Sequence, residues 1–167
     1  AACLGLRRGE ICALKWSDFD WKRKEVKINK ATVLTDESEW KVKNPKSYAG
    51  NRVLSLSDGL IAELKKVSSK GNVIQATPTH ISHRFRWTVK ALGLEHFRFH
   101  DLRHTFATIA LGNGMDVKTL SSMLGHVSAA TTLDIYTHIT DDMRLTAAAN
   151  IDRGIGKAAS EINPCST

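Results

Sequence analysis

The chain has 167 residues, enough for one domain with its own core, and its 42% hydrophobic content excludes a disordered chain. No apolar run approaches the roughly 20 residues that a membrane helix requires, and Arg7, Arg8 and Glu10 interrupt the first apolar segment, which argues against a secretory signal. The three cysteines are odd in number and lack metal-ligand spacing, so a reducing cytoplasm is the expected compartment.

The first third of the chain predicts a helix followed by a small antiparallel sheet. Leu6, Ile11 and Leu14 recur at helical spacing without an N-cap before them, so we expect the chain to be cut from a longer protein. Val26 and Ile28 alternate with polar residues, which indicates a strand. The elements expected here are a turn at 17–21, a strand at 24–35, a polar loop at 36–51 and a strand at 52–56.

Helical periodicity replaces strand alternation from Ser57 onward. Ser57, Asp116 and Ser128 are predicted N-caps, Pro78 suits a first helical turn, and Gly125 suits a helix end. The expected helices span residues 57–67, 78–92, 100–111, 115–126, 128–139 and 140–151, and a flexible tail is expected at 153–167. The predicted fold class is therefore mostly α with a small antiparallel β-sheet near the N-terminus (α+β).

The positive charge of the chain is unevenly distributed. The net charge of +7 divides into +5 for residues 1–56, +4 for residues 57–110 and −2 for residues 111–167. A basic excess over the first two thirds favours a polyanionic partner, with nucleic acid first. Charge alone leaves open a basic protein without such a partner.

The segment FHDLRHTFATIALGNG, residues 99–114, combines an apolar helix pattern with unusual positive potential. His100 and Arg103 are three residues apart and therefore share one helix face. A buried guanidinium requires a partner, because desolvating an unpaired charge costs several kcal/mol. Either a carboxylate such as Glu10 or a bound phosphate would fit. The opposite face is expected to hold Leu102, Phe106, Ile109 and Ala110.

Two further candidates follow this helix. His126 comes directly after Gly125, where a sharp turn lets a side chain project into a cleft, although a histidine there is more often a cap or a surface residue. Tyr136 lies on an amphipathic helix, where an aromatic residue usually belongs to the core. A tyrosine hydroxyl becomes a nucleophile when cations stabilise the phosphate that it attacks.

Two basic candidates precede the helix expected at 100–111. Arg7 follows Gly5-Leu6 at the start of a helix and would supply a second guanidinium, although two surface arginines, Arg7 and Arg8, are the simpler interpretation. Lys46 lies beside a strand in NPKSYAGNRVLSL and is able to donate a proton, although a solvated lysine is the commoner outcome. Lys41 and Lys43 are alternative choices for this role.

The candidates, taken in chain order, resemble the catalytic domain of the tyrosine recombinases, the phage integrase family. They are Arg7, Lys46, His100, Arg103, His126 and Tyr136. The resemblance extends from about Cys3 to about Asn150. Its most specific motifs are HDLRHTFAT at 100–108, LGH at 124–126 and IYTH at 135–138. GLRRGEICALKWSDFD is similar to the first arginine box of the family, and NPKSYAGNRVLSL to its lysine hairpin.

The resemblance implies a covalent mechanism without a metal or other cofactor. Tyr136 would attack a DNA phosphate to give a 3′-phosphotyrosyl link and a free 5′-hydroxyl. Arg7 and Arg103 would bind the non-bridging oxygens. His100 would assist the tyrosine as hydrogen-bonding partner or base.

The remaining roles follow from the same resemblance. His126 would hydrogen-bond the phosphate, and Lys46 would protonate the leaving 5′-oxygen. Glu10 and Asp101 would orient these groups. The matching histidines at two further positions would be supporting residues, namely His104 and His138.

At the level of the whole protein, the resemblance implies a bacterial, nucleoid-associated recombinase that integrates or excises a mobile element. Its partner would be the double-stranded DNA of a recombination site, on which the full-length protein forms a tetramer, with no role for a membrane. Residues 1–167 would form the C-terminal catalytic domain, truncated at its N-terminal end. The alternatives are a non-enzymatic helix-turn-helix module over 116–136 and a type IB topoisomerase.

Overall fold

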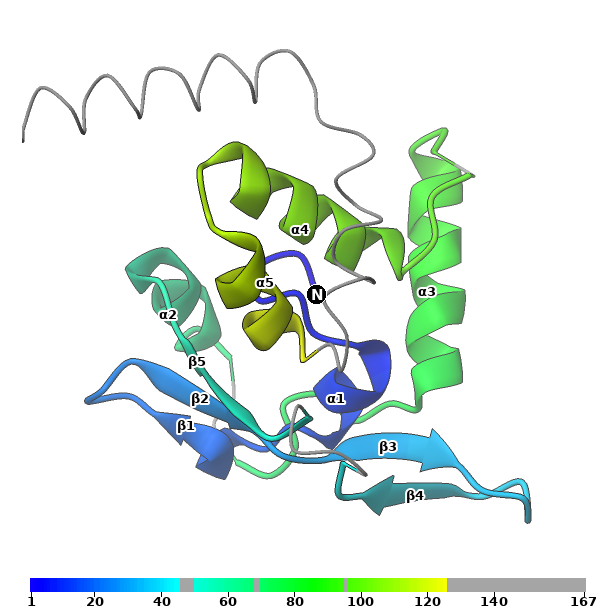
Figure 1. Ribbon diagram of the computed structural model, residues 1–167. Coiled ribbons are helices and arrows are strands. Elements are labelled where there is room, and N and C mark those ends of the chain that lie inside the picture. The colour runs from blue at the N-terminus through cyan, green and yellow to red at the C-terminus, as the bar shows by residue number, and fades with distance from the viewer. Residues whose placement is uncertain (46–49, 68–69, 95, 126–167) are drawn as a thin grey trace, which may run out of the picture.

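The computed structural model describes residues 1–45, 50–67, 70–94 and 96–125. Within this part, short helices surround a small antiparallel sheet and a projecting hairpin, so the predicted α+β class is confirmed (Figure 1). The elements in chain order are α1 Arg8–Ala13, η1 Trp16–Asp18, β1 Phe19–Asp20, β2 Glu25–Ile28, β3 Ala31–Leu34, β4 Trp40–Lys43, β5 Arg52–Ser55, α2 Asp58–Leu64, α3 Pro78–Ala91, α4 Asp101–Gly112 and α5 Val117–Leu124.

The three-stranded sheet has the order β1-β2-β5, and both pairings are antiparallel. Val26 on β2 lies opposite Leu54 on β5, and both side chains are buried. They pack with Leu6, Ile11 and Leu14 from the first helical segment into the main hydrophobic core. The alternation of apolar and polar residues that predicted these strands therefore corresponds to one buried and one exposed face.

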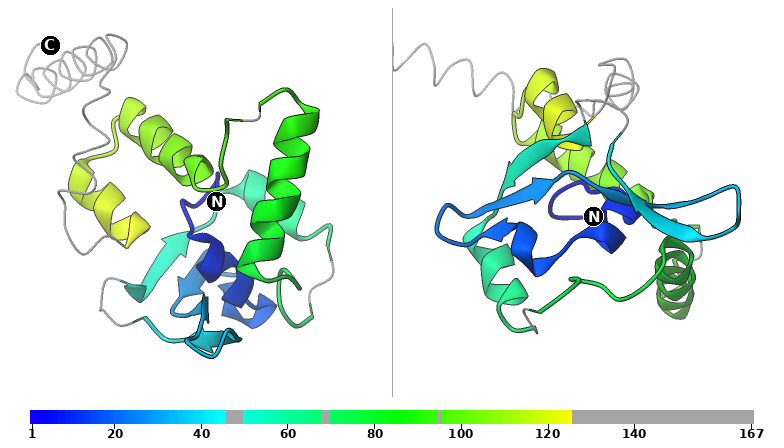
Figure 2. Two further views of the ribbon diagram at one scale, coloured as in Figure 1. Left: turned by 90° about the vertical axis from the view of Figure 1, so that its right-hand side faces the viewer. Right: turned by 90° about the horizontal axis from the view of Figure 1, so that it is seen from below.

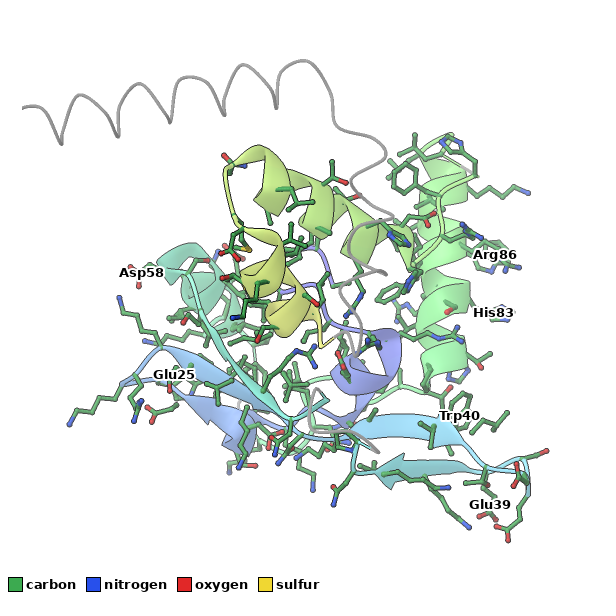
Figure 3. All side chains as sticks on the ribbon, in the orientation of Figure 1. Glu25, Glu39, Trp40, Asp58, His83 and Arg86 are labelled. Carbon is green, nitrogen blue, oxygen red and sulfur yellow. The ribbon has the colours of Figure 1, made fainter. Side chains whose placement is uncertain are left out.

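The predicted continuous strand at 24–35 is wrong, because the chain changes partner after Ile28. Residues 31–34 form β3, which pairs with β4 in a separate two-stranded hairpin. β4 lies inside the segment predicted as a polar loop. The hairpin projects from the sheet, with Glu39 and Trp40 on its outer part (Figure 3). Its strands bury no residue completely, although β4 (WKVK) does alternate apolar and polar residues, a local strand signal that the loop prediction overlooked.

The predicted helix starts are confirmed where a cap residue supplied the signal. Ser57 Oγ accepts a hydrogen bond from the amide of Leu60 at 3.3 Å, and Asp116 Oδ1 accepts one from the amide of Thr119 at 2.9 Å. Pro78 is the first residue of α3. The helices predicted at 128–139 and 140–151 and the tail at 153–167 lie outside the described residues.

A second hydrophobic cluster joins α4 and α5 and contains Ala107, Leu111, Leu120 and Leu124. The N-terminal segment passes between this pair and α3 (Figure 2). Gly5 lies in this segment with a φ of +61°, and a Cβ atom there would come within 2.5 Å of Leu124 and 2.7 Å of Phe106. The segment approaches α4 and α5 this closely because residue 5 has no side chain.

Candidate active site

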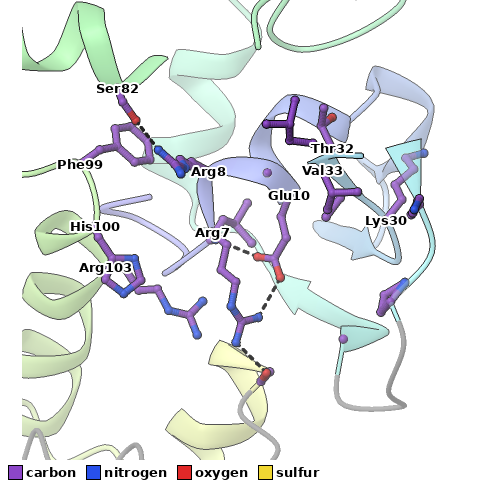
Figure 4. Close-up of a pocket in the computed structure, with 18 of the residues that line it drawn as sticks. Arg7, Arg8, Glu10, Lys30, Thr32, Val33, Ser82, Phe99, His100 and Arg103 are labelled. Carbon is purple, nitrogen blue, oxygen red and sulfur yellow. Dashed lines mark hydrogen bonds and ion pairs between the residues drawn. The ribbon is translucent and has the colours of Figure 1, made fainter. Parts of the chain in front are cut away.

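A groove of about 1340 Å³ opens where α1, the β3–β4 hairpin, α3 and the start of α4 meet (Figure 4). Three of the predicted site residues line it, namely Arg7, His100 and Arg103. They come from the start of α1 and from the start of α4, which are about a hundred residues apart in the sequence. The fold therefore brings the two arginines of the predicted site to one place.

Arg103 forms part of the buried stripe of α4, with only 4% of its surface exposed. Its Nη1 donates to the carbonyl oxygen of Gly5 at 2.6 Å, and its Nη2 donates to that of Leu124 at 2.7 Å. Burial first, and then the charge of Arg7, lowers the pKa of Arg103 to about 10. The guanidinium is therefore still protonated at neutral pH and is held rigidly by the backbone.

These contacts correct one expectation about α4 and answer against one of two alternatives left open for Arg103. The buried stripe consists of Arg103, Ala107 and Leu111, whereas Ile109 is exposed, so Arg103 does not lie opposite the buried side. The carboxylate of Glu10 is also not the hydrogen-bonding partner of Arg103. Backbone carbonyls replace it, and the sequence pattern gives no sign of them because every residue carries one.

Arg7 precedes α1 and is held by two groups. Its Nη1 donates to Glu10 Oε1 at 3.1 Å, and its Nη2 donates to the carbonyl oxygen of Gly125 at 2.9 Å. The neighbouring Arg8 turns toward α3, where its Nη1 donates to Ser82 Oγ at 2.8 Å. The structure therefore distinguishes the two adjacent arginines, because Arg7 and Arg103 both donate to carbonyls at the carboxyl end of α5, whereas Arg8 donates to α3.

Glu10 is buried on α1 and forms a bidentate ion pair with Arg52, the first residue of β5. Arg52 Nη1 donates to Oε1 at 3.0 Å, and Nη2 donates to Oε2 at 2.9 Å. Burial opposes ionisation of Glu10, but the hydrogen bond and charge of Arg52, together with Arg7, outweigh it and hold its pKa below the usual range. The expectation that Glu10 orients Arg7 agrees with these contacts.

The histidines at the start of α4 lie side by side. The ring centroids of His100 and His104 are 4.8 Å apart, with the rings nearly perpendicular. Partial burial, followed by the charges of His104 and Arg103, lowers the pKa of His100 below that of a free histidine. His100 is therefore neutral at pH 7 and is able to accept a hydrogen bond or a proton.

Asp101, the first residue of α4, is hydrogen-bonded to the turn that precedes the helix. Its Oδ2 accepts a hydrogen bond from the backbone amide of Arg98 at 2.7 Å, which lowers the pKa of the carboxyl. Asp101 does not line the groove, so among the described residues its role is to fix the turn that leads into α4. It does not orient the arginines as expected.

A profile of the phage integrase family matches residues 2–143. The chain belongs to the phage integrase family. The matched range includes all six predicted site residues and every residue that lines the groove. It also includes segments outside the described residues, in which three of the six lie.

Curated relatives are recombinases and integrases of bacteria. A XerC-like tyrosine recombinase of Caldanaerobacter subterraneus subsp. tengcongensis is 26% identical over 182 residues, which cover 89% of this chain and 46% of the relative. Tyrosine recombinase XerC of Corynebacterium glutamicum is 33% identical over 150 residues, covering 86% of this chain and 46% of the relative. The ICEBs1 integrase of Bacillus subtilis is 26% identical over 168 residues, covering 89% of this chain and 45% of the relative. The chain thus spans about half the length of these relatives.

Solved structures establish the tyrosine recombinase catalytic fold. The Tn1549 transposon integrase in complex with circular intermediate DNA superposes with a TM-score of 0.71 at 23% identity, over 90% of this chain and 56% of that one. The XerA recombinase superposes with a TM-score of 0.63 at 24% identity, over 99% of this chain and 55% of that one. At this identity the likeness concerns the fold alone.

Lys46, His126 and Tyr136 of this phage integrase domain lie outside the described residues, as does His138. The groove is nevertheless lined by Pro45 and Gly50, on either side of the segment that contains Lys46, and by Gly125, which precedes His126. Of the alternative lysines, Lys43 lines the groove. Lys41 pairs with Glu37 at 2.7 Å and Glu39 at 3.1 Å near the hairpin turn.

The charge of the described site is unbalanced. Three guanidiniums, those of Arg7, Arg52 and Arg103, surround the single carboxylate of Glu10. An excess of two positive charges in a partly buried cluster favours an anionic ligand. In the described part of the chain, no group of three or more histidine, cysteine or acidic residues is arranged to hold a metal ion. Nor is any described helix long and apolar enough to cross a membrane.

Sequence reasoning missed Arg52. It was part of the segment compared with the lysine hairpin, but no role was assigned to it. Strand alternation places Arg52 on the same face as the buried Leu54, but nothing in the sequence identifies the carboxylate that pairs with it. The contact with Glu10 depends on the tertiary fold, which packs β5 against α5 and brings Arg52 to Glu10 on α1.

Proposed function

We propose that this chain carries the active site of a site-specific recombinase that cleaves and rejoins double-stranded DNA through a phosphotyrosyl intermediate on Tyr136. The observation that carries the proposal is the pair of guanidiniums, Arg7 and Arg103, fixed at the floor of a groove with an excess of positive charge. Such an arrangement suits a phosphodiester more than a carboxylate side chain, since the one nearby carboxylate already has its own partners.

The two arginines would stabilise the charge that develops on the non-bridging oxygens of the scissile phosphate. Arg103 uses two of its five N–H donors on carbonyl oxygens, and Arg7 uses two on Glu10 and Gly125. No other described residue accepts from the remaining side-chain donors, which leaves them available for the phosphate. Because the guanidiniums are already oriented, little reorganisation is needed as the charge develops.

Proton transfer would involve His100 and Lys46. The lowered pKa keeps His100 neutral, so it is able to accept the phenolic proton of Tyr136 as the oxygen attacks phosphorus. The bond from phosphorus to the 5′-oxygen then breaks, and Lys46 supplies the proton to that oxygen. His126 would donate a hydrogen bond to the phosphate. The phosphotyrosyl link conserves the phosphodiester energy, and attack by a 5′-hydroxyl reverses the step.

The relatives support DNA of a mobile element as the substrate. They include the ICEBs1 integrase and the Tn1549 transposon integrase in complex with circular intermediate DNA. We extend the proposal to integration or excision of such an element in the bacterial cytoplasm, at the nucleoid, by a longer protein that assembles as a tetramer on its sites. Residues 1–167 then act as its C-terminal catalytic domain.

The test is covalent capture of DNA. A pool of nicked duplexes with a randomised central region is incubated with the protein, because cleavage near a nick releases a short fragment and traps the adduct. Adducts that resist denaturation are collected, the DNA is sequenced, and the linked residue is mapped by mass spectrometry. The proposal expects a 3′-phosphate ester on Tyr136.

The chain offers a matched control, since it contains two tyrosines, Tyr48 and Tyr136. Tyr136→Phe should abolish adduct formation while leaving DNA binding within about twofold, because only the nucleophilic oxygen is removed. Tyr48→Phe should form adducts at the normal rate. Adducts that persist in Tyr136→Phe would mean that another residue is the nucleophile, whereas DNA binding without adducts in the unaltered protein would favour the DNA-binding alternative. Relaxation of supercoiled DNA without strand exchange would indicate the topoisomerase alternative.

A further inference from the structure

Three consecutive carbonyl groups at the carboxyl end of α5 each accept a hydrogen bond from a different arginine. Arg52 Nε donates to the oxygen of Met123 at 2.6 Å. Arg103 Nη2 donates to that of Leu124 at 2.7 Å, and Arg7 Nη2 to that of Gly125 at 2.9 Å. The three arginines come from β5, α4 and the residue before α1, so three distant segments meet at one helix end.

The physical reason for this meeting point is the exposed end of the helix backbone. The last carbonyls of a helix lack partners within the helix and form the negative end of its dipole. Gly125 ends α5 in the left-handed conformation, with its amide bonded back to Ser122, so no described backbone amide occupies the carbonyls of Met123, Leu124 and Gly125. Guanidinium groups satisfy these acceptors and are stabilised by the dipole.

Arg52 differs from the other two arginines in its exposure to the groove. Arg7 and Arg103 line the groove, whereas Arg52 does not. All three of its nitrogens are engaged with protein atoms, two with Glu10 and one with Met123, and 6% of its side chain is exposed. Arg52 therefore has no path to a ligand and influences the site through its partners.

The charge of Glu10 explains why a third arginine is required. The carboxylate holds Arg7, but its negative charge would offset one of the two groove guanidiniums if it were not itself neutralised. The bidentate pair with Arg52 cancels that charge and leaves the charges of Arg7 and Arg103 for an anion. The same guanidinium fixes Met123, next to the carbonyl that anchors Arg103.

We infer that Arg52 is a positioning residue that neutralises Glu10 and clamps the end of α5, so that Arg7 and Arg103 stay fixed and available for a phosphate. This inference rests on the proposed function, because it concerns the same phosphate site. It adds a residue that does not touch the substrate, and it predicts two separable effects, one on anion affinity and one on cleavage rate.

The experiment compares four proteins with the unaltered chain: Arg52→Met, Arg52→Lys, the double variant Glu10→Gln/Arg52→Met, and Val26→Ala as a control. Val26 is fully buried in the sheet and does not line the groove. Its truncation should therefore lower stability, as the loss of Arg52 could, without changing a residue of the site. Inorganic phosphate is titrated and followed by NMR chemical shifts. The rate of adduct formation on nicked DNA and the melting temperature are measured in parallel, below the melting transitions.

Arg52→Met should weaken phosphate binding about tenfold, because Glu10 is left uncompensated beside the site. Arg52→Lys should retain phosphate affinity within about threefold, because its charge remains near Glu10. Its cleavage rate should nevertheless fall about 100-fold, because lysine lacks the fork that holds Glu10 and Met123 together. The double variant should regain phosphate affinity but not the cleavage rate, and Val26→Ala should alter neither.

Each alternative outcome has a distinct meaning. Phosphate affinity and cleavage in folded Arg52→Met equal to those of Val26→Ala would overturn the inference. If Arg52→Met does not fold, Arg52→Lys and the double variant decide, and a normal cleavage rate in either would overturn the positioning role. Absence of both phosphate binding and adducts in the unaltered protein would instead refute the proposed function.

Discussion

Arg103 and His100 lie three residues apart at the start of α4, and burial lowers the pKa of both, yet they differ in charge at neutral pH. Arg103 is anchored on the carbonyls of Gly5 and Leu124, and even a lowered pKa of about 10 leaves it charged at neutral pH. His100 is brought into its neutral form by burial and by the neighbouring charges of His104 and Arg103. One helix turn thus presents a fixed cation and a proton acceptor to the same groove.

This arrangement predicts how cleavage depends on pH. If neutral His100 accepts the tyrosine proton as proposed, the cleavage rate should rise with pH through a midpoint below 6.5, the pKa of a free histidine. Between the lowered pKa and 6.5 the unfolded state binds more protons, so folding stability should also rise with pH there. Single-turnover rates measured from pH 5 upward check the first statement, and urea unfolding at the same pH values checks the second.

His104→Gln tests the cause of the shift. Removing the neighbouring imidazole removes one cause of the shift, so the pKa of His100 should move up but stay below 6.5, because burial is the larger cause. NMR titration of the imidazole protons measures this directly. His80→Gln on α3 provides a comparison that should leave His100 unchanged. A pKa of His100 above 6.5 in the unaltered chain would contradict the assignment of His100 as the base.

At the scale of elements, local signals predicted helix starts well and strand partners poorly. Ser57, Pro78 and Asp116 act within one helical turn of themselves, so their effect is visible in the sequence. The change of partner after Ile28 depends on the distant β5 and on the hairpin that leads to it. The same limit applies to the site, because the carbonyls that hold Arg103 and the contact of Arg52 with Glu10 are tertiary contacts.

The N-terminal segment offers an element-level prediction. Gly5→Ala should lower the free energy of unfolding by about 2 to 4 kcal/mol, because a Cβ atom is strained at positive φ and collides with Leu124 and Phe106. The cleavage rate should fall as well, since the carbonyl of Gly5 anchors Arg103. Urea unfolding and the adduct assay measure the two effects.

Gly59→Ala is the matching control in α2. Nothing lies within 4 Å of a Cβ atom built at Gly59. The substitution should therefore raise stability by about 0.5 to 1 kcal/mol, since alanine is the better helix former. If Gly5→Ala were as stable as Gly59→Ala, the close approach of the N-terminal segment to α4 and α5 would be wrong.

For the whole molecule, the uneven charge suggests which face meets DNA. His83, Arg86 and Lys90 have the spacing of one face of α3, and Figure 3 shows His83 and Arg86 projecting from the same side of that helix. Arg86 also lines the groove. This face continues the basic floor of the site outward, so a duplex whose phosphate reaches Arg103 would pass near it.

A charge-matched pair of variants tests that orientation. Arg86→Gln/Lys90→Gln and Lys22→Gln/Lys27→Gln remove the same charge from exposed positions, the second pair near or on the β1-β2-β5 sheet, outside the groove lining. If α3 faces the DNA backbone, the first pair should reduce the slope of log affinity against log salt by about 1.8, since each phosphate contact contributes about 0.9. The second pair should leave the slope unchanged. Equal reductions in both would mean that net charge alone, with no oriented surface, attracts the DNA.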